Sequence, residues 1–567
     1  MPLHRGVIIP FIVLGLLVVG VLAAVQVVPP EGDRMLPYLA TWLLPLGMAF
    51  LAVGVSHPSR AHHVASALPL ARALAVVTYY LGGFALQFGG VGLVSDHPDL
   101  ARLLAEWSPL DLRLGPGWGL IGLRGFLLSE DVVHGEGLWL FISQLALVTT
   151  AALLPLVTLN GRVPRLPMLL LATLASAVCY PLMGNWVRGS GWLSQLGLTL
   201  GWGHGYVDYG LSSLFLVGSG AALAGLITFR RYGAADAAMR RCGQGPSPDE
   251  TDGAATGDMP RLPPSYLPLN VLLGAFLAMG GWLVTVQYQP TVPSAAAMGA
   301  SLPSLVTRAV LAAASAALAA LLYGWLARGD PDPALAGRAM VAALVAVGAG
   351  LPFLPLGVIV VLGVLVGLAL APVMYLVEQI LRLEDAAASV SVGLFPALAG
   401  ILVVGLFADG RNGAGWNLGD ATLVGSLAPH SALTHLGSAG VASGVGQLWA
   451  QLAGAVALLI LGAALPLMVL SLVARAYTLP TAMVDAARTR AEQVQREREA
   501  RDALKRQGGG LTVWQRAYRA YLRLGARPEV RLIRRRRTVG AARALHAPRR
   551  ARGGSPTGSR RRLPTAR

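Results

Sequence analysis

Residues that could carry catalytic or metal chemistry are few in this 567-residue chain, and they are not spaced for it. Its two cysteines, Cys179 and Cys242, lie in an apolar run and in a basic loop, so we expect neither a disulfide nor a metal pair between them. The ten histidines include no ligand-spaced pair within an apolar run. No Walker loop, dinucleotide fingerprint or catalytic dyad stands on a soluble segment. We therefore expect no catalytic residue, no metal and no cofactor, and neither an ATP-driven pump nor an enzyme with a globular active domain.

The elements that would position any site are membrane spans. The chain is 54% hydrophobic and only 13% charged, with a mean hydropathy of +0.60, whereas a soluble chain carries roughly a quarter charged residues. Its apolar residues fall into runs close to the about 20 residues that a lipid-spanning helix needs. The fold class is therefore an all-α polytopic membrane protein. The predicted spans are 7–29, 36–56, 69–94, 137–159, 167–187, 207–229, 266–287, 303–327, 336–353, 355–380, 388–408 and 441–474.

The first run, 7–29, can be interpreted in two ways. His4 and Arg5 precede it, and small residues after Leu22 could form a signal peptidase site. The run is longer than the ~7–15 residues of a usual signal-peptide core, so an uncleaved signal anchor fits equally well. Both interpretations export the residues after the run and leave eleven later spans. The predicted domains are 1–30 as a signal peptide or signal anchor, 31–478 as the membrane domain and 479–567 as the tail.

Arginine and lysine are unevenly divided between the short loops, which predicts the orientation of the chain. Basic residues gather in the loops on one side of the predicted spans, and acidic or polar residues gather on the other. The positive-inside rule makes the basic side cytoplasmic. The membrane domain then starts outside, and the C-terminus lies in the cytoplasm. The basic loops are 60–63, 162–165, 230–241 and 328–338, and the opposite loops are 96–106, 129–136 and 409–420.

The C-terminal tail accounts for the basic character of the whole chain. Residues 481–567 hold 24 Lys and Arg against 6 Asp and Glu, whereas the net charge of the complete chain is +17. Charges of both signs at helical spacing predict a solvated helix over 481–506. The segment 511–537 mixes Trp514, Tyr518 and Tyr521 with arginines, which is typical of an interfacial helix on anionic lipid. Nucleic acid is the less favoured partner, and the composition after Arg549 is typical of disorder.

Five segments occur along the spans in an informative order. A Tyr-Pro pair at 180–181 precedes NWVRGSGWL at 185–193 and DYGLSSLFLVGSGAALAGL at 208–226. A later span holds GWLVTV at 281–286, and another holds EDAAASVSVGLFPALAGILVVGLFA at 384–408. In order and spacing these segments resemble those of the ammonium transporter family, which includes methylammonium permeases and rhesus-type channels.

This resemblance implies a fold, an assembly and two corresponding helices. Members of the family have two five-helix halves of inverted topology and a last helix, and they assemble as homotrimers with one pore per subunit. Inverted repeats place a transport path at the midplane between the halves. The corresponding helices would start after Asp208 and Asp385, where an acid can accept free N–H groups and suits the helix dipole. We favour this structural role over direct cation binding. The halves would be 36–229 and 266–408, with the last span at 441–474.

The departures from the family concern its conduction residues. In the family, an ammonium ion is recognised by an outer aromatic cluster, loses a proton, passes two stacked phenylalanines and crosses a pore lined by paired histidines; cation–π attraction and the cost of desolvating a charge account for these steps. Matched residue by residue, the retained tryptophan is Trp282. The replaced positions are the two pore histidines at Leu216 and Gly393, the phenylalanines of the third and sixth spans at Leu147 and Thr285, and the outer tryptophan at Arg188.

These replacements have two physical consequences. A pore lined by Leu216 offers no polar relay for a proton, and water could fill a gap at Gly393 only if polar partners were present. Arg188 at the outer mouth would repel ammonium and methylammonium and attract anions, unless it is a helix-end arginine that snorkels to the interface.

Three functions are compatible with these observations, in decreasing order of support. The first is an ammonium-transporter-like channel or transporter whose pore is altered in substrate or closed. The alternative is a non-conducting relative that acts as a sensor or scaffold through its basic tail. An unrelated lipid-handling membrane enzyme comes third, because the spans lack clusters of carboxylates and histidines. Small solutes such as ammonia or ammonium, the other subunits of a homotrimer and anionic lipid are the expected partners.

Overall fold

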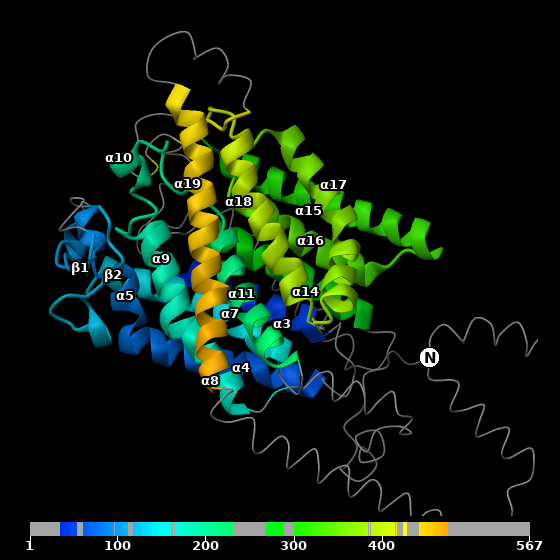
Figure 1. Ribbon diagram of the computed structural model, residues 1–567, viewed down its shortest axis with the longest axis horizontal. Helices are drawn as coiled ribbons and strands as arrows, with labels where there is room; N and C mark the ends of the chain where they lie inside the picture. The colour runs from blue at the N-terminus through cyan, green and yellow to red at the C-terminus, as the bar shows by residue number, and fades with distance from the viewer. Residues whose placement is uncertain are drawn as a thin grey trace, which may run out of the picture. The chain divides into compact units, whose positions relative to one another are not determined.

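A computed structural model gives the fold of the chain (Figure 1). The predictions for the first run 7–29, for Cys242 and for the tail from 479 onward fall outside the residues that the structure describes. The described residues are 35–53, 61–95, 97–110, 117–159, 163, 165–230, 267–287, 300–383, 385, 387–413, 416, 423–427 and 441–473.

The described part of the chain is mostly helical, as the hydropathy predicts. Nine of its helical segments are long and apolar enough to cross a membrane: Met35–Val53, Val64–Leu93, Glu136–Leu159, Leu166–Arg188, Pro268–Gln287, Leu302–Ala327, Leu356–Ile380, Val390–Phe407 and Val445–Val473. Two shorter apolar helices are Ser212–Thr228 and Pro333–Gly348. Together these segments coincide with the predicted spans from 36–56 to 441–474, so the polytopic fold class is confirmed.

The two shorter helices are limited by local features of the chain. Helix α11 (Ser212–Thr228) starts five residues after the predicted boundary, because Leu211 just before it adopts a left-handed conformation. Helix α16 (Pro333–Gly348) stops before a turn that contains Pro352, and Pro355 follows this turn in an extended conformation. At 1.5 Å per residue each is about 25 Å long, slightly less than the ~30 Å hydrocarbon core. A total of eleven crossings therefore stays a prediction.

The remaining elements complete the two halves and the last helix, with η marking 3-10 or π-helical turns. The first half contains α2 (Met35–Ala40), α3 (Leu43–Val53), α4 (Ala61–Thr78), η2 (Tyr79–Gly83), α5 (Phe84–Phe88), η3 (Val91–Leu93), η4 (Pro98–Leu100), η5 (Phe126–Leu128), α7 (Glu136–Leu159), α8 (Arg165–Leu174), η6 (Ala175–Cys179), α9 (Tyr180–Arg188) and α10 (Leu196–Leu200) before α11. The second contains α14 (Leu267–Gln287), α15 (Leu302–Arg328), α16, α17 (Leu356–Tyr375), η9 (Leu376–Ile380), η10 (Val390–Leu394) and α18 (Phe395–Phe407). Helix α19 (Val441–Leu459) continues through η13 (Ile460–Ala464) to residue 473.

Helix α11 lies at the centre of the bundle. It packs against α7 from the first half, against η10 and α18 from the second, and against η13 of the last helix. Nearly every residue from Ser212 to Leu226 is buried. In Figure 1, α19 crosses in front of the bundle, with α11 and α7 behind it. Of the residues matched to the family pore, Leu216 therefore lies on this buried helix, and Leu147 and Gly393 lie on elements that pack against it.

The two halves also meet along α3 and α14, where glycines allow close backbone contact. A side chain at Gly281 would meet the backbone of Leu43 and Leu44, and one at Gly47 would meet the backbone of Gly274 and Ala278. Small residues of this kind let membrane helices approach each other closely. The glycine content therefore has a packing role here.

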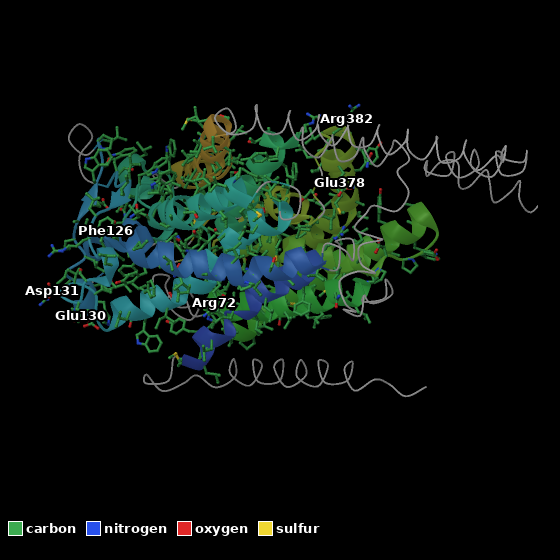
Figure 2. The ribbon with its side chains drawn as sticks, turned by 90° about the horizontal axis from the view of Figure 1, so that it is seen from below. Arg72, Phe126, Glu130, Asp131, Glu378 and Arg382 are labelled. Carbon is green, nitrogen blue, oxygen red and sulfur yellow. The ribbon has the colours of Figure 1, made fainter. Side chains whose placement is uncertain are left out.

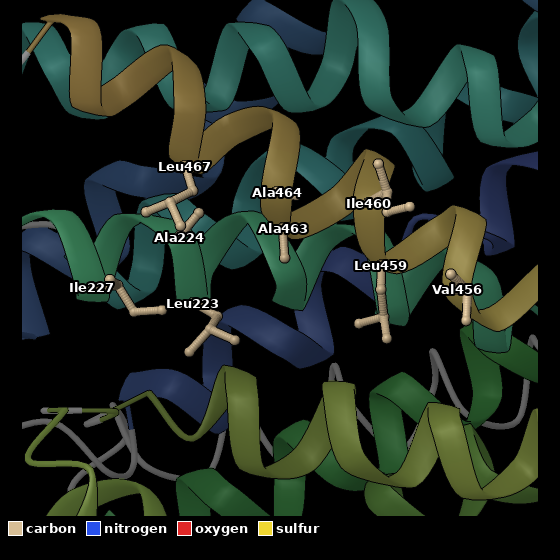
Figure 3. A pocket seen from close by; sticks show the side chains of 9 residues that line it. All are labelled: Leu223, Ala224, Ile227, Val456, Leu459, Ile460, Ala463, Ala464 and Leu467. Atoms are coloured by element: carbon tan, nitrogen blue, oxygen red, sulfur yellow. The ribbon is translucent and has the colours of Figure 1, made fainter.

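Two surface features complete the description of the bundle. On α4, Arg72 is exposed at the surface of the bundle (Figure 2). Its guanidinium carbon lies 3.3 Å from the ring centroid of Trp42, and this cation–π contact offsets part of the cost of a charge on a membrane span. An apolar groove of about 340 Å³ runs between the C-terminal end of α11 and the second half of α19 (Figure 3). Its lining residues are Leu223, Ala224, Ile227, Val456, Leu459, Ile460, Ala463, Ala464 and Leu467.

Candidate functional site

Two buried acids stand at the starts of the two central helices and bind their backbone in the same way. Asp208 accepts hydrogen bonds from the amides of Ser212 (3.1 Å) and Ser213 (2.7 Å). Asp385 accepts from the amides of Val390 (3.0 Å) and Ser391 (2.8 Å) and from the Ser391 hydroxyl (3.0 Å). Helix starts leave N–H groups without a partner inside the helix. Both carboxylates therefore act on backbone donors, and each is only 1% exposed.

The backbone repeats along with the acids. Leu211 has a φ of 75° and Ala388 a φ of 54°, although neither is glycine. Each stands three residues after its acid. A left-handed turn at the same offset in both halves is a local sign of the internal repeat, and one that was not evident from the sequence because the two residue types differ.

Helix α16 shows that the two acidic turns lie at different depths. The hydroxyl of Ser212 donates to the carbonyl of Val345 (2.7 Å) and accepts from the amide of Ala349 (2.8 Å), near the end of α16. Asp385 interacts electrostatically with Arg338, near the start of the same helix. About 16 Å of helix separates Arg338 from Ala349. The two central helices thus start from opposite ends, as in an inverted repeat.

Side chains occupy the space directly beside Gly393, one of the two positions matched to pore histidines. Leu216 is fully buried on α11, and Gly393 is buried in η10 against the same helix. A Cβ on Gly393 would overlap the hydroxyl of Ser219 and would lie 3.7 Å from Phe215. The Ser219 hydroxyl donates to the carbonyl of Ser389 (2.8 Å). The glycine therefore makes room for a serine, and the gap that the sequence left open is occupied.

The other matched pore residues are also engaged with their surroundings. Leu147 is fully buried on α7, which packs on α11. Thr285 turns its hydroxyl back to the carbonyl of Gly281 (2.7 Å) on its own helix. Trp282 donates from its indole to the carbonyl of Gly210 (2.8 Å), in the turn that precedes α11. The retained tryptophan thus holds the Asp208 turn in place.

Arg188 points into the protein, so the snorkelling interpretation does not describe its geometry. Its guanidinium Nη2 donates to the carbonyls of Asp208 and Tyr209, each at 2.9 Å. Next to this contact the ring of Tyr209 packs against Phe353 (centroids 6.4 Å) and Trp416 (6.3 Å). A positive charge consequently stands at this end of α11, where the family has an aromatic side chain.

Two glutamines of α19 fasten the loop before Asp208, and sequence reasoning missed them. Gln447 accepts from the amide of His204 (3.0 Å) and donates to the carbonyl of Gly205 (2.9 Å). Gln451 accepts from the amide of Val207 (3.0 Å) and donates to the carbonyl of the same residue (2.8 Å). The signal available in the sequence was a pair of amides four residues apart in an apolar span, which places both on one helix face.

A second buried polar network, also missed, joins the second, third and fourth spans of the N-terminal half. Tyr79 donates to Gln87 (2.9 Å), Gln87 donates to Gln144 (3.2 Å), and Tyr180 donates to Gln144 (2.6 Å). The side chain of Asn185 donates to the carbonyl of Gln87 (3.2 Å). Buried polar groups that bond one another in this way fix helix positions in a membrane bundle.

Comparison with known proteins agrees with this architecture. The sequence profile of the Ammonium Transporter Family matches residues 35–487. Ammonium transporter Amt2 of Archaeoglobus fulgidus is 26% identical over 371 residues, which are 65% of this chain and 69% of that protein. The solved Sensor Amt Protein is 18% identical with a TM-score of 0.56 over 82% of this chain and 94% of its own. Candida albicans Mep2 is 19% identical with a TM-score of 0.55 over 78% of this chain and 82% of its own.

These findings define a polytopic, helical membrane protein with an ammonium-transporter-like fold. Because the profile covers most of the length, the chain belongs to the Ammonium Transporter Family. The resemblance noted in the sequence is thereby confirmed.

Proposed function

We propose that this ammonium-transporter-like membrane protein conducts ammonium and methylammonium poorly or not at all. The observation that carries the proposal is the packing between the two central helices, where Ser219 and Phe215 lie directly beside Gly393. A charged ammonium ion at the bilayer centre costs at least ~2.5–3.5 kcal/mol, so it must first give its proton to a polar group. Leu216 and Gly393 supply no such group at the histidine positions.

The charge at the mouth supports the same proposal. Arg188 is fixed to the carbonyls of Asp208 and Tyr209 instead of extending to the surface. A fixed guanidinium beside the entrance raises the local positive potential and lowers the local concentration of cations. Neutral ammonia would not be repelled in this way.

The test is uptake of labelled methylammonium into proteoliposomes, with Archaeoglobus Amt2 as the positive control. We expect the unmodified chain to show less than about a tenth of the uptake of Amt2, which corresponds to ~1.4 kcal/mol in barrier height. A variant meant to restore uptake must also change Ser219, because a histidine at 393 would overlap that side chain. The triple change Leu216→His, Ser219→Gly and Gly393→His is therefore the one to compare with the double change that keeps Ser219.

Saturable uptake by the unmodified chain, close to that of the control, would refute the proposal. Uptake gained by the triple variant but not by the double variant would show that side-chain filling, as well as the lost histidines, closes the path. If neither variant transports, the sensor function becomes the better one.

The sensor function is the second candidate, and one contact favours it. Gln447 and Gln451 connect the loop before Asp208 to α19, the last described helix before the basic tail. A change in the conformation of that loop would therefore alter the hydrogen bonds of the helix that leads into the tail. The similarity to the Sensor Amt Protein supports the shared fold.

We also propose the assembly and orientation that the sequence predicts. Family membership supports a homotrimer. The positions of the basic loops support a cytoplasmic C-terminus. The segment 511–537 would then lie on anionic lipid, and the protein would not be an enzyme. Native mass spectrometry in detergent tests the trimer, and a stable monomer would count against it. Salt-independent vesicle binding by the isolated 511–537 peptide would exclude the lipid contact.

A further inference from the structure

The connection between α5 and α7 carries a loop, residues 123–131, whose exposed tip is apolar. A short hairpin precedes the loop, in which β1 (Glu106–Trp107) pairs with β2 (Ile121–Gly122). Three large apolar side chains of the loop are exposed within five residues, Leu123 by 48%, Phe126 by 43% and Leu127 by 53%. Apolar side chains that gather on the surface in this way mark an interaction surface.

Both ends of the tip are fixed to the rest of the protein. Gly125, before the tip, is buried with a φ of 92°, and a Cβ on it would lie 3.2 Å from the side chain of Leu103. After the tip, Val133 is buried. Arg102 also donates from its guanidinium to the carbonyl of Asp131 (2.6 Å). The apolar tip therefore projects from a fixed base.

The backbone of the tip is strained. Leu127 has a φ of 55° and Leu128 a φ of 48°, a left-handed conformation that residues other than glycine rarely adopt. Strain of this kind persists where the surrounding structure imposes it, and it is found most often at functional segments. Burial inside the protein does not compensate for it at Leu127, because that side chain is exposed.

The tip lies against a lipid-facing part of a membrane span. Its turn η5 packs on η2, which belongs to the span Val64–Leu93. A Cβ on Gly82 of η2 would lie 3.5 Å from the ring of Phe126. Tyr80 and Leu81 of the same turn are exposed, and tyrosine is typical of the boundary between membrane and water. The apolar tip therefore continues the surface that this span presents to lipid.

Charged side chains limit the depth at which the tip can lie. Glu130 and Asp131 are exposed beside it, and Figure 2 shows both at the same end of the molecule as Phe126. Arg124, on the other side of the tip, is exposed as well. A charge is costly in hydrocarbon, so these three residues belong among the lipid headgroups. Apolar side chains next to charged ones are the pattern of segments that lie in the membrane interface.

We propose that loop 123–131 is a membrane anchor, which inserts Phe126 and Leu127 into the interface of the bilayer while Glu130 and Asp131 stay among the headgroups. The anchor fixes the connection between the second and third spans to the lipid surface. Its partner is therefore the bilayer itself, and not a solute of the pore. The contact does not depend on conduction, so it goes beyond the proposed function and is measured independently of it.

The test places a fluorescent label at single positions of the full chain in proteoliposomes. Phe126→Cys, Leu127→Cys and Glu130→Cys are each combined with Cys242→Ser and coupled to a nitrobenzoxadiazole iodoacetamide, while the native Cys179 is buried. Two quenchers are compared, a phospholipid with a nitroxide on the upper acyl chain and iodide in the buffer. Nitroxide should quench the labels at 126 and 127 at least about twofold more than the label at 130, because an interfacial segment lies ~5–10 Å into the bilayer. Iodide should give the reverse order.

Glu130→Cys is the matched control, since this position is exposed in the same loop. Each labelled variant must first elute with the unmodified chain in size-exclusion chromatography. Equal nitroxide quenching at the three positions, or stronger iodide quenching at 126 and 127 than at 130, would overturn the proposal by placing the tip in water. Weak quenching of 126 and 127 by both reagents would also overturn it, because a second subunit or another protein would then cover the tip.

Discussion

Asp208 and Asp385 close the same kind of turn in the two halves, but the structure around them differs. Both oxygens of Asp208 accept backbone amides, whereas the Oδ1 of Asp385 is buried without a hydrogen-bond partner among the described residues. The Asp208 turn is also held from outside by Trp282 and by Gln451. The two halves therefore share one turn geometry, but among the described residues only the Asp208 turn, at the mouth, has a partner for both carboxylate oxygens.

The largest expected difference between the turns comes from removing the acids. Asp208→Ala should destabilise the chain by about 3 kcal/mol, since it removes two charge-assisted bonds to a helix start. Asp385→Ala should cost about half as much. The substitution also removes a buried oxygen that has no partner, and this favourable change offsets part of the free energy lost with the hydrogen bonds. Thermal unfolding in detergent, followed by tryptophan fluorescence, measures both.

Glu130→Ala serves as the reference for this pair, and as an exposed surface change it should stay within about 0.5 kcal/mol of the unmodified chain. Equal losses for the two aspartates would mean that the additional contacts around Asp208 do not strengthen its turn.

The arginine near each acid should show a smaller difference in the same direction. Arg188 donates to two carbonyls, whereas Arg338 has a sulfur acceptor, Met374, at 3.5 Å. Sulfur is a weak acceptor. Arg188→Met should therefore cost about 2 kcal/mol and Arg338→Met about 1 kcal/mol or less. The same unfolding assay applies, and a greater loss for Arg338→Met would reverse the comparison.

The left-handed residues give the smallest effects, and these should differ in sign. A non-glycine residue in this conformation costs roughly 1–2 kcal/mol. Ala388→Gly relieves that cost with little side chain to lose, so it should stabilise by about 0.5–1 kcal/mol. Leu211→Gly also gives up a side chain that is only 4% exposed, and it should destabilise by about 1 kcal/mol. A shift of the same sign in both variants would contradict this account.

The sequence predicted most of the membrane scaffold because lipid imposes a simple rule. A spanning helix must be apolar over its length, so the spans could be located from hydropathy alone. The boundaries of α11 and α16 were less predictable, since a left-handed leucine and a pair of prolines limit those helices. The capping of two helices by Asp208 and Asp385 could also be predicted, because the hydrogen-bond partners lie within six residues of each acid.

The site itself was less predictable, because its contacts join distant segments. Whether Arg188 snorkels or turns inward depends on carbonyls that lie 20 and 21 residues further along the chain. From the sequence, Gly393 predicts an empty space where the family has a histidine. Only the fold shows that Ser219 occupies this space. The bonds of Gln447 reach residues 204 and 205, more than 240 positions away, so the paired amides at 447 and 451 indicate a polar helix face but not the loop that it binds.

The way in which α19 holds the loop before Asp208 has a consequence for how this protein can vary among its relatives. In their contacts with this loop, Gln447 and Gln451 bond backbone atoms of residues 204–207. These contacts therefore require no particular side chain in the loop, and packing is what constrains the buried Tyr206 and Val207. The glutamines have no such freedom, because a hydrocarbon side chain would leave amides and carbonyls unpaired. In an alignment of near relatives, both amides should therefore persist on the helix even where a side chain of the loop changes.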